Sequence, residues 1–248
     1  MLRNIVLSTL RRDVYTKPVA ALLAVGWAAS VALASLGSTF AAVVTAINML
    51  SLISSLVAMV GSAIFTAGDR EGLLEVYLSG GGRPRYAAAR LVANAVVSAL
   101  LALAVSAPYV AVRQIAAPLA AALLASVPSS IVGTVLGLAY SNRAALAAVV
   151  VWAALALLYD VVVAFLSLIL PLGDVAILAI QLANFLKLPS ILATTAVDPY
   201  LLTLGPLGDF ITAHWGLGLA QAAVGSVYAA WLIALVLFYT DTARRMDL

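Results

Sequence analysis

The sequence predicts an all-α polytopic membrane protein. Hydrophobic residues make up 65% of the chain and charged residues only 9%, whereas about 25% of the residues in a soluble domain are charged. The mean hydropathy is +1.15. Several apolar stretches are long enough to cross a hydrocarbon core of about 30 Å as helices. Because a bundle of such spans forms one unit, residues 1–248 are expected to be a single transmembrane domain.

Six transmembrane helices are expected. The predicted spans cover residues 18–36, 41–67, 86–110 and 116–140, a fifth span that begins near Ala144, and residues 216–239. Pro18 suits the start of the first helix, because an N–H group there has no partner within the helix. Residues 1–15 carry apolar side chains at helical spacing, with charged side chains between them. This pattern predicts a short interfacial helix on the membrane surface.

The basic residues orient these spans. Cytoplasmic segments of membrane proteins are enriched in Lys and Arg. With six spans and cytoplasmic termini, all of the 13 Lys and Arg residues except Arg113 and Lys187 fall on the cytoplasmic side. An odd number of spans would remove this asymmetry. We therefore expect a multi-pass protein of the cell membrane, embedded in the lipid bilayer. The basic residues flank the spans rather than form one solvated face, so no nucleic acid partner is expected.

Residues 161–215 do not fit a simple span. Two apolar arms flank the turn "PLGD", and each arm is too short to cross a bilayer alone. This predicts a re-entrant or interfacial helical hairpin on the outer side, followed by an outer loop. The alternative makes residues 175–196 a further span. That span would bury Gln181, Asn184 and Lys187 in the hydrocarbon core, which is costly.

The residue types that carry catalysis or bind metals are scarce. There is no cysteine, and His214 is the single histidine, so no metal site is expected. The sequence has no G-x-x-x-x-G-K-[ST] phosphate loop, so the chain itself is not expected to hydrolyse ATP. Neither catalysis nor a cofactor is therefore expected on this chain.

One face of the second span carries a stripe of polar residues. They lie three, four or seven residues apart: Thr45, Asn48, Ser51, Ser55, Ser62 and Thr66. Such a stripe can line a path for a cargo, and Asn48, Ser51 and Ser55 are the candidate pathway residues. Alternatively, the small hydroxyl residues permit close packing between helices. The two interpretations can coexist.

Two other positions interrupt the apolar pattern. In the fourth span, "SVPSSIVG" predicts a kink at Pro128 whose freed carbonyl groups meet hydroxyl groups. Asp160 is the ionisable residue placed well inside a predicted span. Its carboxylate is expected either to face the bundle interior or a cavity, as a further pathway residue, or to cap a new helix that begins there.

The stretch "GDREGLLEVYLSGGGRPR", residues 68–85, gathers charges between two apolar runs. Residues 69–79 can form a short amphipathic cytoplasmic helix. Glu71 and Glu75 share one face, while Leu74 and Leu78 share another. A helix with an acidic face and a leucine face suits docking into a groove on a partner protein, although it could also be an ordinary solvated helix.

The longer stretch "EGLLEVYLSGGGRPRYAAAR" resembles the signature after the second span of type-2 export permeases of ATP-binding-cassette (ABC) transporters. The matching positions are Gly72, Leu74, Glu75, Leu78, Ser79 and Arg83. Leu73 replaces a Thr of the pattern, and three glycines replace its Pro-containing turn. The C-terminal "ARRMDL" also resembles the usual ending of the family.

The resemblance implies a transport mechanism. Two permease chains would pair around a central path as a homodimer or heterodimer, and separate ABC ATPase subunits would bind ATP and Mg²⁺. Residues 69–79 would be the coupling helix, and "YSNR", which contains Arg143, would be a second contact with the ATPase. The implied activity is export of a cargo. The alternatives are an ATP-independent secondary transporter and a membrane scaffold for an assembly or maturation complex on the same fold.

Overall fold

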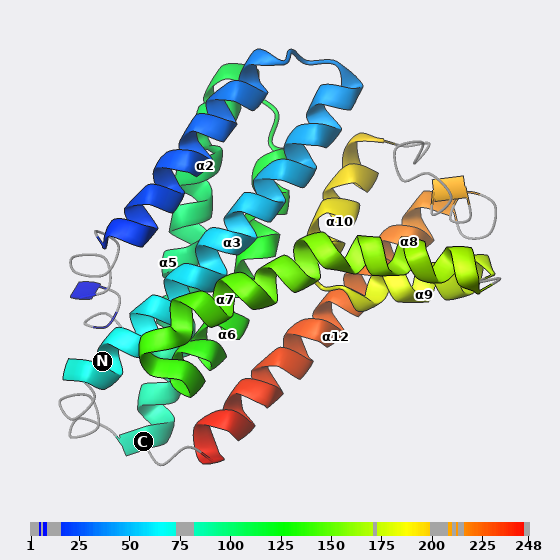
Figure 1. Cartoon of the computed structure of the whole chain (residues 1–248). Coiled ribbons are helices and arrows are strands. Elements are labelled where there is room, and N and C mark those ends of the chain that lie inside the picture. The colour runs from blue at the N-terminus through cyan, green and yellow to red at the C-terminus, as the bar shows by residue number, and fades with distance from the viewer. Residues whose placement is uncertain are drawn as a thin grey trace.

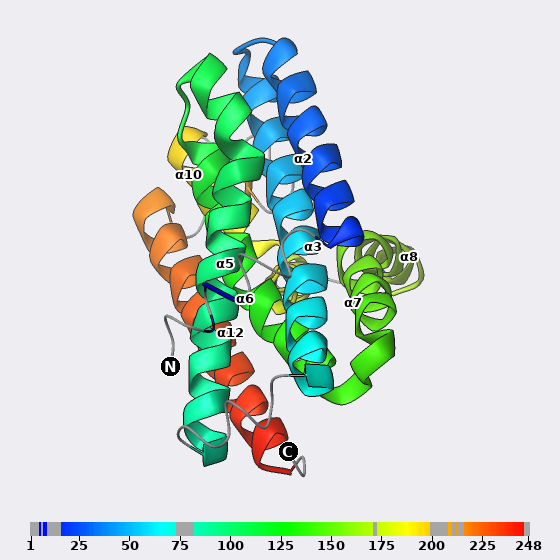
Figure 2. The same cartoon turned by 90° about the vertical axis from the view of Figure 1, so that its left-hand side faces the viewer.

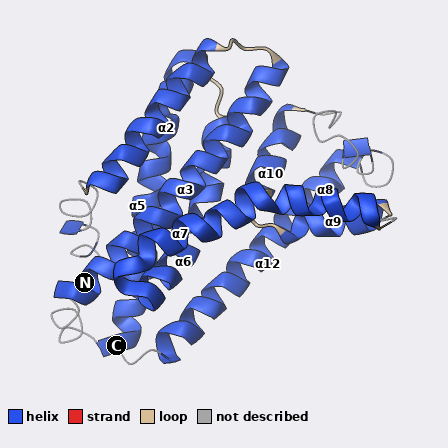
Figure 3. Ribbon diagram, in the orientation of Figure 1, coloured by secondary structure: helices blue, strands red, loops and turns tan. Residues whose placement is uncertain are grey.

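The computed structural model describes residues 5, 7, 8, 16–72, 82–170, 173–198, 208, 209, 212 and 216–245. In these residues all regular structure is helical (Figure 3). The elements are α2 (Lys17–Ser35), α3 (Phe40–Gly72), α5 (Gly82–Arg113), α6 (Ala117–Tyr140), η2 (Ser141–Arg143), α7 (Ala144–Ala153), η3 (Ala154–Leu158), α8 (Tyr159–Ile169), α9 (Asp174–Ala183), α10 (Leu188–Val197) and α12 (Gly216–Arg245).

The chain is an α-helical protein with several helices able to cross a membrane. Five helical stretches of the described residues are long and apolar enough to do so: Lys17–Ser35, Phe40–Asp69, Arg85–Arg113, Ala117–Ile169 and Gly216–Arg245. Each predicted span falls on one of these stretches. The predicted fourth and fifth spans lie together in Ala117–Ile169, where the short η2 helix separates α6 from α7.

Helices α2, α3 and α5 pack in a defined register. α2 and α3 are antiparallel and joined by a short turn, and α5 runs in the direction of α2 (Figures 1 and 2). A Cβ atom added at Gly26 of α2 would lie 3.1 Å from Ile53 and 3.0 Å from Val105, so the three helices meet there. Since Gly26 faces Ile53, Lys17 lies level with residue 62. The rest of α3 extends beyond the start of α2 by about 15 Å.

Helices α3 and α6 touch through their backbones. A Cβ atom added at Gly133 would lie 2.1 Å from the carbonyl oxygen of Met59, and one at Gly137 would lie 2.6 Å from the carbonyl oxygen of Ala63. No larger residue fits at these two positions, which lie one helical turn apart. Small residues at this spacing are a common means of bringing membrane helices together.

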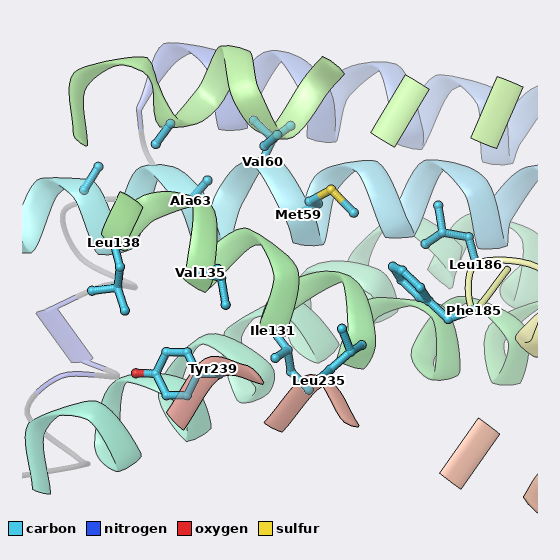
Figure 4. Close-up of a cluster of buried hydrophobic side chains, with 13 residues drawn as sticks. Met59, Val60, Ala63, Ile131, Val135, Leu138, Phe185, Leu186, Leu235 and Tyr239 are labelled. Carbon is cyan, nitrogen blue, oxygen red and sulfur yellow. The ribbon is translucent and has the colours of Figure 1, made fainter. Parts of the chain in front are cut away.

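A buried hydrophobic cluster holds α6 against its neighbours (Figure 4). Met59 of α3, Ile131 of α6 and Leu235 of α12 belong to it, and Ala148 adds a contribution from α7. Phe185, which follows α9, packs its ring 5.8 Å from that of Trp231. The cluster therefore joins the bundle to the segment that follows α9, in the second arm of the predicted hairpin.

Helices α8 and α9 project sideways from the bundle (Figures 1 and 2). The chain remains helical from Ala144 to Ile169 through the π-helical segment η3, and it then turns back into α9. Residues 175–196 are not one helix: α9 and α10 have ten residues each and are separated at Asn184–Lys187. Ten residues rise only about 15 Å, so neither helix can cross a bilayer alone.

The predicted interfacial helix, residues 1–15, lies largely outside the described residues. Of this segment Ile5, Leu7 and Ser8 are described. Ile5 is fully buried and belongs to a cluster with Tyr86 and Ala93 of α5. This part of the N-terminal segment therefore packs on the beginning of α5.

Candidate functional site

A buried ion pair lies where α3 ends and α5 begins. The Arg90 Nε atom is 3.2 Å from the Asp69 Oδ2 atom, and the Tyr86 hydroxyl donates a hydrogen bond of 3.0 Å to the same oxygen. All three residues are at most 1% exposed. Removing either charge would break this contact in a buried environment, which is unfavourable.

The position of Asp69 corrects the sequence-based prediction. The predicted cytoplasmic helix of residues 69–79 does not begin at Asp69, because α3 continues through Gly72 and Asp69 lies in its final turns. Residues 73–79 of the predicted helix lie outside the described residues. Helix α3 continues because the carboxylate finds Arg90 on the facing helix and needs no solvent. Asp69 therefore ties α3 to α5 inside the bundle.

An amide joins three helices one turn deeper in the bundle. The Asn94 side-chain amide donates to the hydroxyl oxygen of Thr66 at 2.9 Å and to that of Thr134 at 2.8 Å. These residues come from α5, α3 and α6, and all are fully buried. Ser62 and Ser98 form a further hydrogen bond of 3.2 Å between α3 and α5.

The polar stripe of α3 serves packing at one end and is exposed at the other. Ser62 and Thr66 contact α5, as described above. Ser55 is buried and accepts a hydrogen bond of 2.8 Å from the Trp152 indole of α7. Ser51 is also buried, whereas Asn48 is exposed. The structure thus places Ser51 and Ser55 inside the chain and leaves Asn48 on its surface.

Asp160 lies on the projecting part of the chain and pairs with Lys187, whose ammonium also donates to the Gln181 side-chain oxygen at 3.1 Å. The Asp160 side chain is 52% exposed in the isolated chain. The chain stays helical from α7 into α8, so Asp160 does not cap a new helix. No hydrogen bond or ion pair of the described residues joins it to Ser51 or Ser55.

The π-helical segment next to Asp160 is held by a buried amide. The Asn184 side-chain nitrogen donates to the Leu155 carbonyl oxygen at 2.7 Å, and its side-chain oxygen accepts from the backbone N–H of Leu186 at 3.1 Å. The Tyr159 hydroxyl donates to the Ile180 carbonyl oxygen at 2.5 Å. These bonds fasten α8 to α9 and to the turn that follows.

At Pro128, where the sequence predicts a kink, the carbonyl group freed by the proline accepts a hydrogen bond from another helix. Because proline lacks an N–H group, the Leu124 carbonyl has no helical donor. The Tyr228 hydroxyl of α12 donates to it at 2.7 Å. Ser129 and Ser130 instead donate to carbonyl oxygens of Ala125 and Val127 in their own helix. The hydroxyl that compensates for the proline is therefore Tyr228.

The residues expected to contact an ATPase are described only in part. Glu71 lies in the last turn of α3, and its side chain is not described. Leu74, Glu75 and Leu78 lie outside the described residues. Arg143 is exposed in η2, which packs against α3. The end of α3, the start of α5 and η2 all lie at one end of the bundle (Figure 1).

The buried polar seam between α3 and α5 was missed by the sequence analysis, although a signal exists. Arg90, Asn94 and Ser98 recur every four residues along α5, which places them on one helical face. The same spacing on α3 was interpreted as a pathway or a packing surface. The complementary stripe on α5 favours packing within the chain for the part of that face that carries Ser62 and Thr66.

The buried polar side chains described above join helices α3, α5 and α6 to one another. No group of three or more His, Cys, Asp or Glu residues that could hold a metal ion occurs among them. Comparison of the sequence with models of known families and with curated proteins found no match. The helices described above define the class of the protein, which is an α-helical membrane protein.

Proposed function

We propose that the chain is the membrane-spanning subunit of an ABC transporter that exports a cargo, powered by separate ATPase subunits. The observation that carries the proposal is the "EGLLEVYLSGGGRPR" stretch, which resembles the family signature and connects α3 to α5. The packing of η2, with Arg143, against α3 supports it, because both proposed ATPase contacts then lie at one end of the bundle.

In this proposal the chain crosses the membrane six times. Ala117–Ile169 contains 53 residues, which as one straight helix would be about 80 Å long, far more than a bilayer requires. Ser141 has a φ of +44° and ends α6, so the chain can reverse at this point. α6 and the α7–α8 rod then make two crossings, and both termini lie in the cytoplasm.

The transport path is proposed to lie between two copies of this chain or between it and a paralogue. Asn48 is exposed on α3 and Asp160 is half-exposed on α8, so both side chains are available to such a path. Ser51 and Ser55 are buried within the chain and would support the path rather than line it. Cofactors are not proposed on this chain, since ATP and Mg²⁺ would bind the ATPase.

The test is a charge reversal in the proposed coupling segment. Glu75→Lys should reduce the amount of ATPase that co-purifies with the chain, or uncouple ATP hydrolysis from cargo, because reversing one charge at a desolvated contact costs several kcal/mol, on the order of 2–5. The matched control is Asp241→Lys at the end of α12, where an exposed pair with Arg245 is lost. It should leave both measurements unchanged.

Equal and normal behaviour of the two variants would refute coupling through residues 69–79. Cargo movement by the purified chain in liposomes under an ion gradient, with no ATPase present, would instead support a secondary transporter. A stable complex that contains an ATPase but whose hydrolysis responds to no cargo would support the scaffold.

A further inference from the structure

Five buried side-chain oxygens of the described residues have no hydrogen-bond partner there, and all five lie on α3 or α5. They are Oγ of Ser51, Ser54 and Ser106, Oδ1 of Asn94 and the hydroxyl of Tyr109. Each of these residues is at most 1% exposed. Buried polar groups in folded proteins are almost always hydrogen-bonded, so a cluster of unpartnered ones requires an explanation.

The register of α3 on α5 brings four of these groups to the same level. Asp69 faces Arg90, Thr66 faces Asn94 and Ser62 faces Ser98. Each turn backward along α3 therefore matches one turn forward along α5.

If this register continues along the two helices, the turns of α3 that carry Ser51 and Ser54 face the turns of α5 that carry Ser106 and Tyr109. The meeting of Ile53 and Val105 at Gly26 confirms that the two helices are still in contact at this level. Ser51, Ser54, Ser106 and Tyr109 are called the hydroxyl layer below.

Two hydroxyl groups near this layer, those of Ser30 and Ser55, already have partners. The Ser30 Oγ accepts a hydrogen bond of 3.1 Å from the backbone N–H of Tyr109. Ser55 accepts from Trp152 and donates to the Leu52 carbonyl oxygen at 2.7 Å. Ser30 and Ser55 are thus bonded to other groups, and a small molecule that both donates and accepts hydrogen bonds would satisfy the hydroxyl layer.

We propose that water molecules bind in the hydroxyl layer and bridge α3 to α5 inside a single chain. One buried water makes about three hydrogen bonds to groups that would otherwise be unsatisfied. An apolar ligand would leave the hydroxyls unpaired, at a large cost in a bilayer. A metal cation would find no carboxylate to balance its charge, because the facing turns carry none. Water both donates and accepts hydrogen bonds and brings no charge that needs balancing.

Hydration would make the α3–α5 contact unlike the α3–α6 contact. At Gly133 and Gly137 the backbones of α3 and α6 touch, so any shift meets a steric barrier. Water-bridged hydroxyls can exchange partners, so α5 can shift against α3 in the outer half of the bundle without leaving a polar group unpaired. This holds whichever cargo the protein moves, and independently of an ATPase.

X-ray radiolytic labelling tests this directly, because side chains next to bound water are oxidised by hydroxyl radicals formed there. The full chain in nanodiscs would be irradiated and the modification of each tyrosine followed by mass spectrometry. Tyr109 should be modified several-fold faster than Tyr239, which is equally buried but donates its hydroxyl to the Ala87 carbonyl oxygen at 2.8 Å. Equal and slow modification of both tyrosines would overturn the proposal.

Near-isosteric deletions give a second readout. If water is shared in the layer, Ser51→Ala and Tyr109→Phe should each lower the unfolding temperature by about 2–4 °C. The unfolding temperature of the double variant should then fall by less than the sum of the two single decreases. If the layer is dry, deleting an unpartnered hydroxyl leaves the unfolding temperature unchanged or raises it, and this outcome would contradict the proposal. Ser129→Ala is the control, since that hydroxyl bonds within its own helix.

Discussion

The hydroxyl of Tyr228 on α12 donates a hydrogen bond of 2.7 Å to the carbonyl oxygen of Leu124 on α6. Pro128, four residues after Leu124, cannot supply the helical N–H that this carbonyl would otherwise accept. The hydrogen-bond donor that α6 lacks at Pro128 is thus supplied by a side chain of α12, about a hundred residues later in the chain. This hydrogen bond joins α12 to α6 in the bundle.

This relationship predicts a conditional effect of removing the hydroxyl. Tyr228→Phe should lower the free energy of unfolding by about 1–3 kcal/mol, because the Leu124 carbonyl is left unsatisfied. In a Pro128→Ala background the same substitution should cost much less, because residue 128 then donates to Leu124. Thermal unfolding of the four proteins in detergent measures this. An equal cost in both backgrounds would show that the hydrogen bond does not compensate for the proline.

The contact between α3 and α6 predicts that Gly133 tolerates no side chain. Even Gly133→Ala places a Cβ atom 2.1 Å from the Met59 carbonyl oxygen, so the helices must separate. We expect a fall in unfolding temperature and in the yield of folded protein. Gly225→Ala on α12 is the matched control, because a Cβ atom there meets nothing within 4 Å. Similar yields from the two variants would contradict the packing described.

The buried ion pair predicts that one missing charge is worse than two. Asp69→Leu removes the carboxylate that pairs with the buried Arg90 guanidinium and should destabilise the protein by about 3–5 kcal/mol. Adding Arg90→Met should restore part of that loss, because a well-packed apolar pair can replace a buried ion pair. Asp241→Leu, which removes an exposed pair one turn apart, should cost about 0.3–0.5 kcal/mol. Unfolding temperatures of the three variants and the unmodified protein measure this, and a double variant no more stable than Asp69→Leu would contradict the prediction.

The proposed topology predicts which ends of the bundle an impermeant reagent reaches. Ser38 is exposed in the turn between α2 and α3, and Arg143 is exposed in η2 at the other end. In intact cells a cysteine at Ser38 should react with an impermeant maleimide, and one at Arg143 should react only after permeabilisation. The absence of native cysteine removes background labelling. The reverse pattern would invert the orientation.

The positions of the long helices could be predicted from the sequence because each is an apolar run bounded by charges or by Pro and Gly. Residues 216–239, for example, lie within α12. The partners across helices could not be predicted. The sequence predicts Asp69 at the start of a separate cytoplasmic helix, because residues 68–85 gather charges between two apolar runs. Its burial depends on Arg90, which only the antiparallel packing of α3 on α5 brings into contact.

The same limit applies to the serines of the candidate pathway. Their spacing on α3 defines a face but not what covers that face. The structure shows that Trp152 covers Ser55 and that Asn48 stays exposed. The π-helical segment before Asp160 also carries no local signal, because its Leu155 carbonyl is satisfied by Asn184 from beyond α9.

The unequal lengths of α2 and α3 give the bundle a mechanical property. α3 has 33 residues, and its last turns reach past the start of α2, so about 15 Å of α3 has no α2 beside it. In this part of the bundle the Asp69–Arg90 pair ties α3 to α5, and the close contact at Gly137 ties it to α6. A force applied at the tip of α3 is therefore passed to α5 and α6 rather than to α2. A tilt of about 10° displaces the tip by roughly 3 Å over that length.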